Sequence, residues 1–140
     1  MNAKLLFIAA TIGAPALKDR PPPEASIKGE WKVESRLDHG KHSTDQNLWI
    51  FSDGGVAVIR DPTGETVRSH LTYTVSAAGP VKEIDFLEGQ AVGRGSERQG
   101  IYKIDGDTLT LSFTRGKTPR PTSLDPSNEG YLLVLKRVKK

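Results

Sequence analysis

The sequence predicts an all-β protein, folded as an antiparallel up-and-down barrel of about eight strands. Three observations support this fold class. Beyond residue 26, apolar and polar residues alternate with a period of two in successive short segments. Turn residues (Gly, Pro and Asp) separate these segments at intervals of about a dozen residues. No segment after the N-terminal leader has a helical period, and closing the sheet would remove its exposed edges.

The first predicted strands follow this pattern closely. In residues 31–37 the odd-numbered positions form the apolar face, while Lys32, Glu34 and Arg36 alternate with them on the solvent face. The next two strands are the apolar runs 48–51 and 56–59. Asp53 and the two glycines after it join these runs as a hairpin, because left-handed turn positions suit Gly and tolerate Asp.

Two more strands are predicted in the middle of the chain. Residues 61–64, Asp-Pro-Thr-Gly, turn the chain into a longer strand at 67–75. One face of that strand carries Val67, Ser69, Leu71, Tyr73 and Val75. A short strand follows, in which Ile84 and Phe86 alternate with acidic residues.

The last three predicted strands are 100–104, 109–113 and 131–135. The first two are joined by the tight turn Asp105-Gly106-Asp107, and a longer loop with three prolines, 114–128, precedes the third. Residues 131–135 are apolar on both faces, so this strand is expected to lie centrally or to close the sheet.

Three segments make up the predicted domain organisation: a signal peptide at 1–16, a proline-rich spacer at 17–26 and the barrel at 27–138. Lys4, a short apolar run and the triplet Ala-Pro-Ala ending at Ala16 are typical of a secretory leader. The run is too short to span a bilayer. Cleavage after Ala16 would export the protein to the periplasm or the exterior; the alternative is an apolar N-terminal strand or helix of a cytosolic protein.

The composition excludes several function classes. The chain has no cysteine, which rules out disulfides, thiolate catalysis and Cys-ligated metal sites. Its formal net charge is only +3, and its basic clusters lack interleaved exposed aromatic residues, with Tyr131 as the one near exception. We therefore predict no nucleic-acid partner. Attachment to an anionic envelope surface would explain the basic C-terminal tail equally well.

The sequence shows no catalytic motif. His39, His42 and Asp45 carry ligand types that suit zinc or copper, but they lie in a polar segment where nothing holds them rigidly. We interpret that segment as a solvated loop, and we predict no metal, no cofactor and no enzyme. The aspartates Asp105 and Asp107 are interpreted as capping the amides of their own turn. Asp85 is expected to pair with a neighbouring Arg or Lys.

The segment Gly29-Glu30-Trp31 resembles the Gly-x-Trp signature of lipocalins. In that fold the Trp closes one end of the barrel, and an Arg of the last strand packs across its ring. The resemblance implies this role for Trp31 and identifies Arg137 as the partner, in a cation–π contact worth about 0.5–2 kcal/mol.

The chain also resembles an uncharacterised lipocalin-like domain family that is abundant in planctomycete bacteria, often behind signal peptides. The likeness covers residues 27–138 and implies a small secreted barrel with no established reaction. It departs from the family pattern at 93–99, which is richer in glycine and charge. The motif residues of the two resemblances are Gly29, Trp31, Asp85, Gly100, Tyr102, Asp105, Gly106, Asp107, Arg120, Pro121 and, from the lipocalin likeness, Arg137.

These observations lead to one leading hypothesis: an exported, non-enzymatic barrel that binds a small apolar ligand or an envelope partner. The expected lid is the loop 37–47, and the expected ligand-lining residues are Trp49, Phe51, Tyr73, Phe86 and Phe113. The alternative is a filled barrel that acts as a protein-interaction module through its surface. A metal-dependent or hydrolytic enzyme is the least favoured hypothesis.

Overall fold

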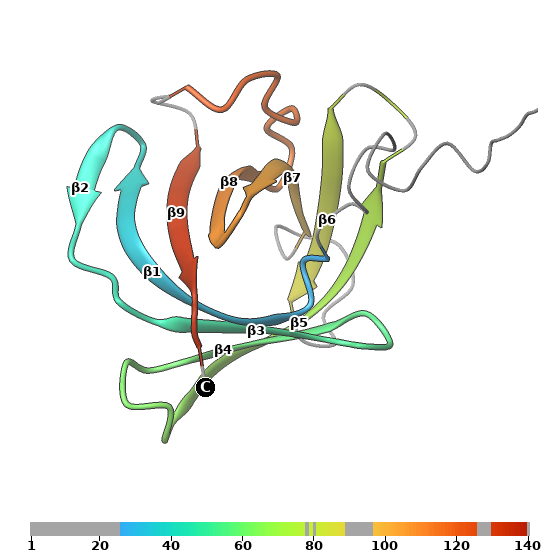
Figure 1. Ribbon diagram of the computed structural model, residues 1–140. Helices are drawn as coiled ribbons and strands as arrows, with labels where there is room; N and C mark the ends of the chain where they lie inside the picture. Colours follow the sequence, from blue (N-terminus) through green and yellow to red (C-terminus); the bar gives the residue numbers. More distant parts are fainter. Residues whose placement is uncertain (1–25, 78, 80, 89–96, 126–129, 140) are drawn as a thin grey trace, which may run out of the picture.

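A single antiparallel sheet closes into a barrel in the computed structural model, which describes residues 26–77, 79, 81–88, 97–125 and 130–139 (Figure 1). This part of the chain contains strands and no helix, hence none that is long and apolar enough to cross a membrane. The strands are β1 (Gly29–Asp38), β2 (Lys41–Ser43), β3 (Leu48–Ser52), β4 (Val56–Arg60), β5 (Val67–Ser76), β6 (Lys82–Glu88), β7 (Glu97–Asp105), β8 (Thr108–Arg115) and β9 (Tyr131–Arg137).

The strand order confirms the predicted up-and-down barrel. Each strand from β3 to β9 pairs with its neighbour in the chain, and β9 pairs back onto β1 to close the ring. The strand predicted at 131–135 therefore does close the sheet. β2 is an additional strand that pairs only with the end of β1, through a turn at His39 and Gly40, both with positive φ. The expected loop 37–47 is thus partly a hairpin, because β1 continues to Asp38.

The centre of the barrel is filled with aromatic side chains. The five residues predicted to line a ligand cavity contact one another as a cluster, with ring centroids 5.2–6.3 Å apart. Leu109, Leu111, Leu133 and Leu135 complete the core around them and have no accessible surface. Interiors packed in this way leave few voids larger than a water molecule.

One end of the barrel is closed by the contact that the lipocalin resemblance implies. The Arg137 guanidinium carbon lies 4.1 Å from the centre of the Trp31 ring, and Trp31 is fully buried. Arg137 also donates hydrogen bonds to the carbonyl oxygens of Ser26 and Lys28, both at 3.0 Å. The Trp31 indole donates to the carbonyl of Ile27 at 2.8 Å. These bonds tie the residues before β1 across the barrel end.

Arg120 attaches the long β8–β9 connection to the barrel wall. Its guanidinium pairs with Asp85 at 2.7 Å and donates to the carbonyl of Gly100 at 2.9 Å. Asp85 thus has the basic partner that the sequence led us to expect, and its role here is structural.

The β7–β8 turn differs from the interpretation of its aspartates. Asp107 forms ion pairs with Lys139 at 2.9 Å and with Arg137 at 3.9 Å, instead of capping the turn amides. The hydrogen bond and charge of Lys139 lower the pKa of Asp107. The carboxylate therefore holds the C-terminal end of the described chain against the turn.

Gly100 allows β7 and β8 to approach each other, and we predict that Gly100→Ala lowers the free energy of unfolding by about 1–3 kcal/mol. An added Cβ would lie 2.6 Å from the Ser112 carbonyl oxygen and 2.9 Å from Phe113 Cβ. Neither the backbone of Ser112 nor the buried side chain of Phe113 can move aside without a large cost in free energy. Urea denaturation measures the change. The control is Gly79→Ala, whose Cβ would meet nothing closer than 4.0 Å; equal losses in the two variants would contradict the prediction.

Candidate functional site

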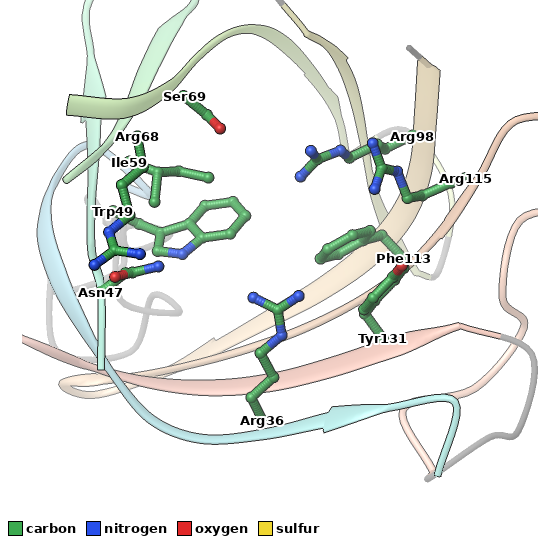
Figure 2. A pocket seen from close by; sticks show the side chains of 10 residues that line it. All are labelled: Arg36, Asn47, Trp49, Ile59, Arg68, Ser69, Arg98, Phe113, Arg115 and Tyr131. Atoms are coloured by element: carbon green, nitrogen blue, oxygen red, sulfur yellow. The ribbon is translucent and has the colours of Figure 1, made fainter. Parts of the chain in front are cut away.

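The open end of the barrel holds a pocket of about 170 Å³ that is lined largely by polar side chains. It lies at the opposite end of β1 and β9 from Trp31. In Figure 2 the lining side chains converge on one space, with Arg98 and Arg115 on the side opposite Trp49. The lining residues are Arg36, Asn47, Trp49, Ile59, Arg68, Ser69, Arg98, Phe113, Arg115 and Tyr131.

A β-bulge turns Arg36 into the barrel. In the β1–β9 ladder Val33 is opposite Leu135, but Ser35 is opposite Val134, so Glu34 is an extra residue. One extra residue reverses which side chains face inward beyond it. The prediction that Arg36 lies on the solvent face, with Ser35 and Leu37 inward, is therefore wrong.

A second bulge places Arg68 at the rim of the pocket. Ile59 is opposite Ser69 and Arg60 is opposite Val67, which leaves Arg68 as the unpaired residue of β5. The same shift turns Val67 out of the predicted apolar face, and Val67 and Val75 are both exposed. Ser69, Leu71 and Tyr73 keep the predicted inward orientation, and Ser69 lines the pocket.

Regular alternation of inward and outward side chains along β7 and β8 places the other two arginines, Arg98 and Arg115, at the pocket. Arg98 continues the inward face of Gly100 and Tyr102 on β7, and Arg115 continues that of Phe113 on β8; the two arginines are directly opposite in the ladder. The strands predicted at 100–104 and 109–113 stop short of both residues. β7 and β8 are longer than predicted, and this added length carries the arginines into the mouth of the barrel.

Arg36 is well neutralised within the protein. Its Nε donates to Asp38 Oδ1 and its Nη1 to Asp45 Oδ2, both at 2.5 Å. Burial lowers the pKa of Arg36, but the two carboxylates raise it by more. The guanidinium also lies 5.4 Å from the centre of the Tyr131 ring, which stacks on Phe113. Arg36 is thus a fixed part of the pocket wall.

Arg98 is buried and only partly neutralised. Its Nη2 donates to Glu88 Oε1 at 2.5 Å, but Glu88 is shared with Arg115 at 3.4 Å. Burial, together with the nearby charge of Arg115, lowers the pKa of Arg98, and Glu88 offsets this only in part. Within the described part of the chain Arg98 Nε has no hydrogen-bond partner, although the residue is only 8% exposed.

Trp49 supplies a second buried donor without a partner. Its indole Nε1 has no acceptor among the residues that the structure describes, and the residue is 1% exposed. Leaving a buried donor unsatisfied costs about 1–3 kcal/mol, so such groups are rare and call for an explanation. Trp49 and Arg98 line the same pocket. Two residues with unpartnered buried donors therefore meet at one pocket.

The other predicted site residues are distributed unevenly around this pocket. Trp49 and Phe113 line it, whereas Phe51 does not, and Tyr73 and Phe86 border a more open cavity of about 280 Å³ instead. Of the residues in the expected lid, Asn47 lines the pocket, and Asp38 and Asp45 bind Arg36 in its wall. The hydroxyl of Tyr73 donates to the Ser52 carbonyl at 3.0 Å, so this residue is held by the core.

His39, His42 and Asp45 do not form a metal site. His39 lies in the turn before β2, His42 is exposed on β2, and the Asp45 carboxylate binds Arg36. Among the residues that the structure describes, no three His, Asp or Glu side chains gather in a group that could hold a metal ion.

Sequence comparison adds nothing to the geometry of the site: no protein-family model matches the chain, and no curated protein matches it. The chemistry of the pocket is therefore the feature that carries information about function.

The unequal neutralisation of the two arginines leads to a stability prediction. We expect Arg98→Met to keep the free energy of unfolding within about 1 kcal/mol of the original or to raise it, because it removes a desolvated charge and leaves Glu88 half-exposed beside Arg115. Arg36→Met should lower it by about 2–3 kcal/mol, because it leaves the buried Asp45 carboxylate without its cation. Urea denaturation measures both, and a larger loss for Arg98→Met than for Arg36→Met would show that Arg98 is a structural residue.

Proposed function

We propose that this protein is an exported, non-enzymatic, lipocalin-like barrel that binds a small anion-bearing ligand in the pocket at its mouth. One observation carries the proposal: two buried N–H donors, Trp49 Nε1 and Arg98 Nε, have no partner in the described part of the chain, and both residues line a pocket together with three further arginines. Buried donors beside incompletely neutralised cations favour a negatively charged acceptor.

The charges around the pocket support an anion as the ligand. Arg68 has no ion pair within the described part of the chain, and Arg98 and Arg115 share one carboxylate. Guanidinium groups present planar donor pairs that match carboxylate and phosphate oxygens. Since the pocket is partly enclosed, these interactions are less screened by solvent and salt than on an open surface.

The size and lining of the pocket favour a small polar ligand over the apolar ligand that the sequence led us to expect. A cavity of about 150 Å³ accommodates benzene, so 170 Å³ holds only a small molecule or one end of a larger one. The aromatic cluster beneath the pocket fills the space that an apolar ligand would need.

The chemistry of the lining side chains supports binding without turnover. Arginine stays protonated throughout the physiological pH range and is a poor proton-transfer group. Ser69 is the aliphatic hydroxyl among the lining residues, and no histidine or carboxylate lines the pocket beside it in the described chain. A serine without a general base is a weak nucleophile.

Thermal unfolding tests anion binding. Acetate, sulfate and phosphate are titrated separately at constant ionic strength, and at least one should raise the unfolding midpoint, because a ligand that binds only the folded state stabilises it by mass action. Arg98→Met should reduce the apparent affinity at least tenfold, since it removes the least neutralised buried cation.

The control variant is Lys103→Met, which removes the same charge from an exposed position on β7. It should bind within about twofold of the original protein. If none of the anions shifts the midpoint, or if both variants respond alike, the proposed function is wrong.

The outer wall supports a second candidate function, a protein-interaction surface. Val81 is 43% exposed and borders a cavity of about 380 Å³ between β6, β7 and the β8–β9 connection, together with Ile101 and Pro121. Isolated exposed apolar residues are common on soluble proteins, so this surface ranks below the pocket.

Export is proposed on the leader sequence, and residues 1–16 lie outside the described residues. We predict that the protein isolated from its own host begins at Leu17, because the Ala-Pro-Ala triplet ends at Ala16. Mass spectrometry of the intact protein measures this. A mass that includes Met1 and the apolar leader would show that no cleavage occurs.

A further inference from the structure

We infer that the ligand is a monocarboxylate whose body carries hydroxyl groups, such as a sugar acid. The inference rests on the proposed function and adds the charge of the anionic group and the chemistry of the attached body. Two features of the described residues carry it: the charge balance around the pocket, and a polar groove that continues from it.

The charge balance favours one negative charge. Four arginines line the pocket, and three carboxylates pair with them: Asp38 and Asp45 with Arg36, and Glu88 with Arg98 and Arg115. This leaves one positive charge uncompensated. A bound carboxylate would bring the site to neutrality, whereas a phosphate dianion would leave it negative in a partly buried environment, which costs free energy.

The number of unpartnered buried donors matches the two oxygens of a carboxylate group. Trp49 Nε1 and Arg98 Nε are the two buried side-chain donors without a partner in the described chain, and both residues line the pocket. A carboxylate has two oxygens, and each can accept one of these bonds. Both donors belong to almost fully buried residues of the pocket wall, where an unpartnered N–H group is costly.

A polar groove gives the rest of the ligand its chemistry. A cavity of about 360 Å³ adjoins the pocket and shares Arg36, Asn47 and Arg68 with it. Its remaining lining residues are Asp38, Ser43, Thr44, Asp45, Gln46 and Pro62. Most of these carry hydroxyl, amide or carboxylate groups, which include both donors and acceptors. Hydroxyl groups also donate and accept, so a hydroxylated body satisfies this lining and an alkyl chain does not.

Isothermal titration calorimetry of the full chain tests the inference with four probes: glucuronate, glucose, hexanoate and inorganic phosphate. Glucuronate should bind at least tenfold more tightly than glucose, which lacks the carboxylate. It should also bind more tightly than hexanoate, which lacks the hydroxyl groups, and than phosphate at pH 7.5, where phosphate is mainly a dianion.

A variant in the groove tests the contribution of the hydroxylated body independently of the contribution of the carboxylate. Thr44→Val removes one exposed hydroxyl at nearly constant shape, and it should weaken glucuronate binding several-fold while leaving hexanoate binding unchanged. The matched control is Thr110→Val on β8, which lies outside both cavities and should change neither.

Each other outcome overturns a defined part of the inference. Tighter binding of phosphate would refute the monocarboxylate and leave the proposed anion-binding function intact. Equal binding of hexanoate and glucuronate, or an unchanged affinity in Thr44→Val, would refute the hydroxylated body. If neither carboxylate nor phosphate binds to the folded protein, the proposed function fails together with the inference.

Discussion

The pairing of β1 with β9 is the interaction on which both ends of this barrel depend. It joins the two ends of the sheet, and its register runs from Trp31 opposite Arg137 to Asp38 opposite Tyr131. At one end of this ladder the Arg137 guanidinium covers Trp31 and closes the barrel. At the other end Arg36 packs against Tyr131 in the wall of the pocket. The extra residue Glu34 between them changes the inward face from apolar to charged.

The pocket shows how a barrel keeps charges inside without losing its core. Below the mouth, the interior is a continuous aromatic and aliphatic cluster that supplies most of the hydrophobic stabilisation. The charged layer is confined to the strand ends, where solvent is close and ion pairs are available. Arg36 is neutralised by two carboxylates, whereas Arg98 shares the single carboxylate of Glu88 with Arg115, and the indole N–H of Trp49 has no acceptor among the described residues. Such donors reduce stability and are rare in folded proteins, and this imbalance is the feature on which the proposed binding role rests.

The fold was largely predictable because its signal is local. Alternation placed each barrel strand, the turn residues Asp53 and Gly106 marked two hairpins, and the doubly apolar segment 131–135 indicated the closing strand. The site was far less predictable. Trp49 and Phe113 were expected to line a cavity and do so, but none of the four pocket arginines was assigned to it. Arg98 and Arg115 lie just beyond the predicted strands, and the sign of alternation at Arg36 and Arg68 is reversed or interrupted by bulges.

The amino-acid sequence by itself determined that this chain forms antiparallel strands around an aromatic core, because period-two patterning and turn chemistry act over a few residues. It also determined that any chemistry would have to do without cysteine. Only the tertiary structure decided which residues meet at the mouth. A bulge is defined by the register between two strands that can be a hundred residues apart in the chain, and one extra residue exchanges inside and outside for all that follows. The presence of four arginines around one small pocket is therefore a property of the closed sheet rather than of any segment of the sequence.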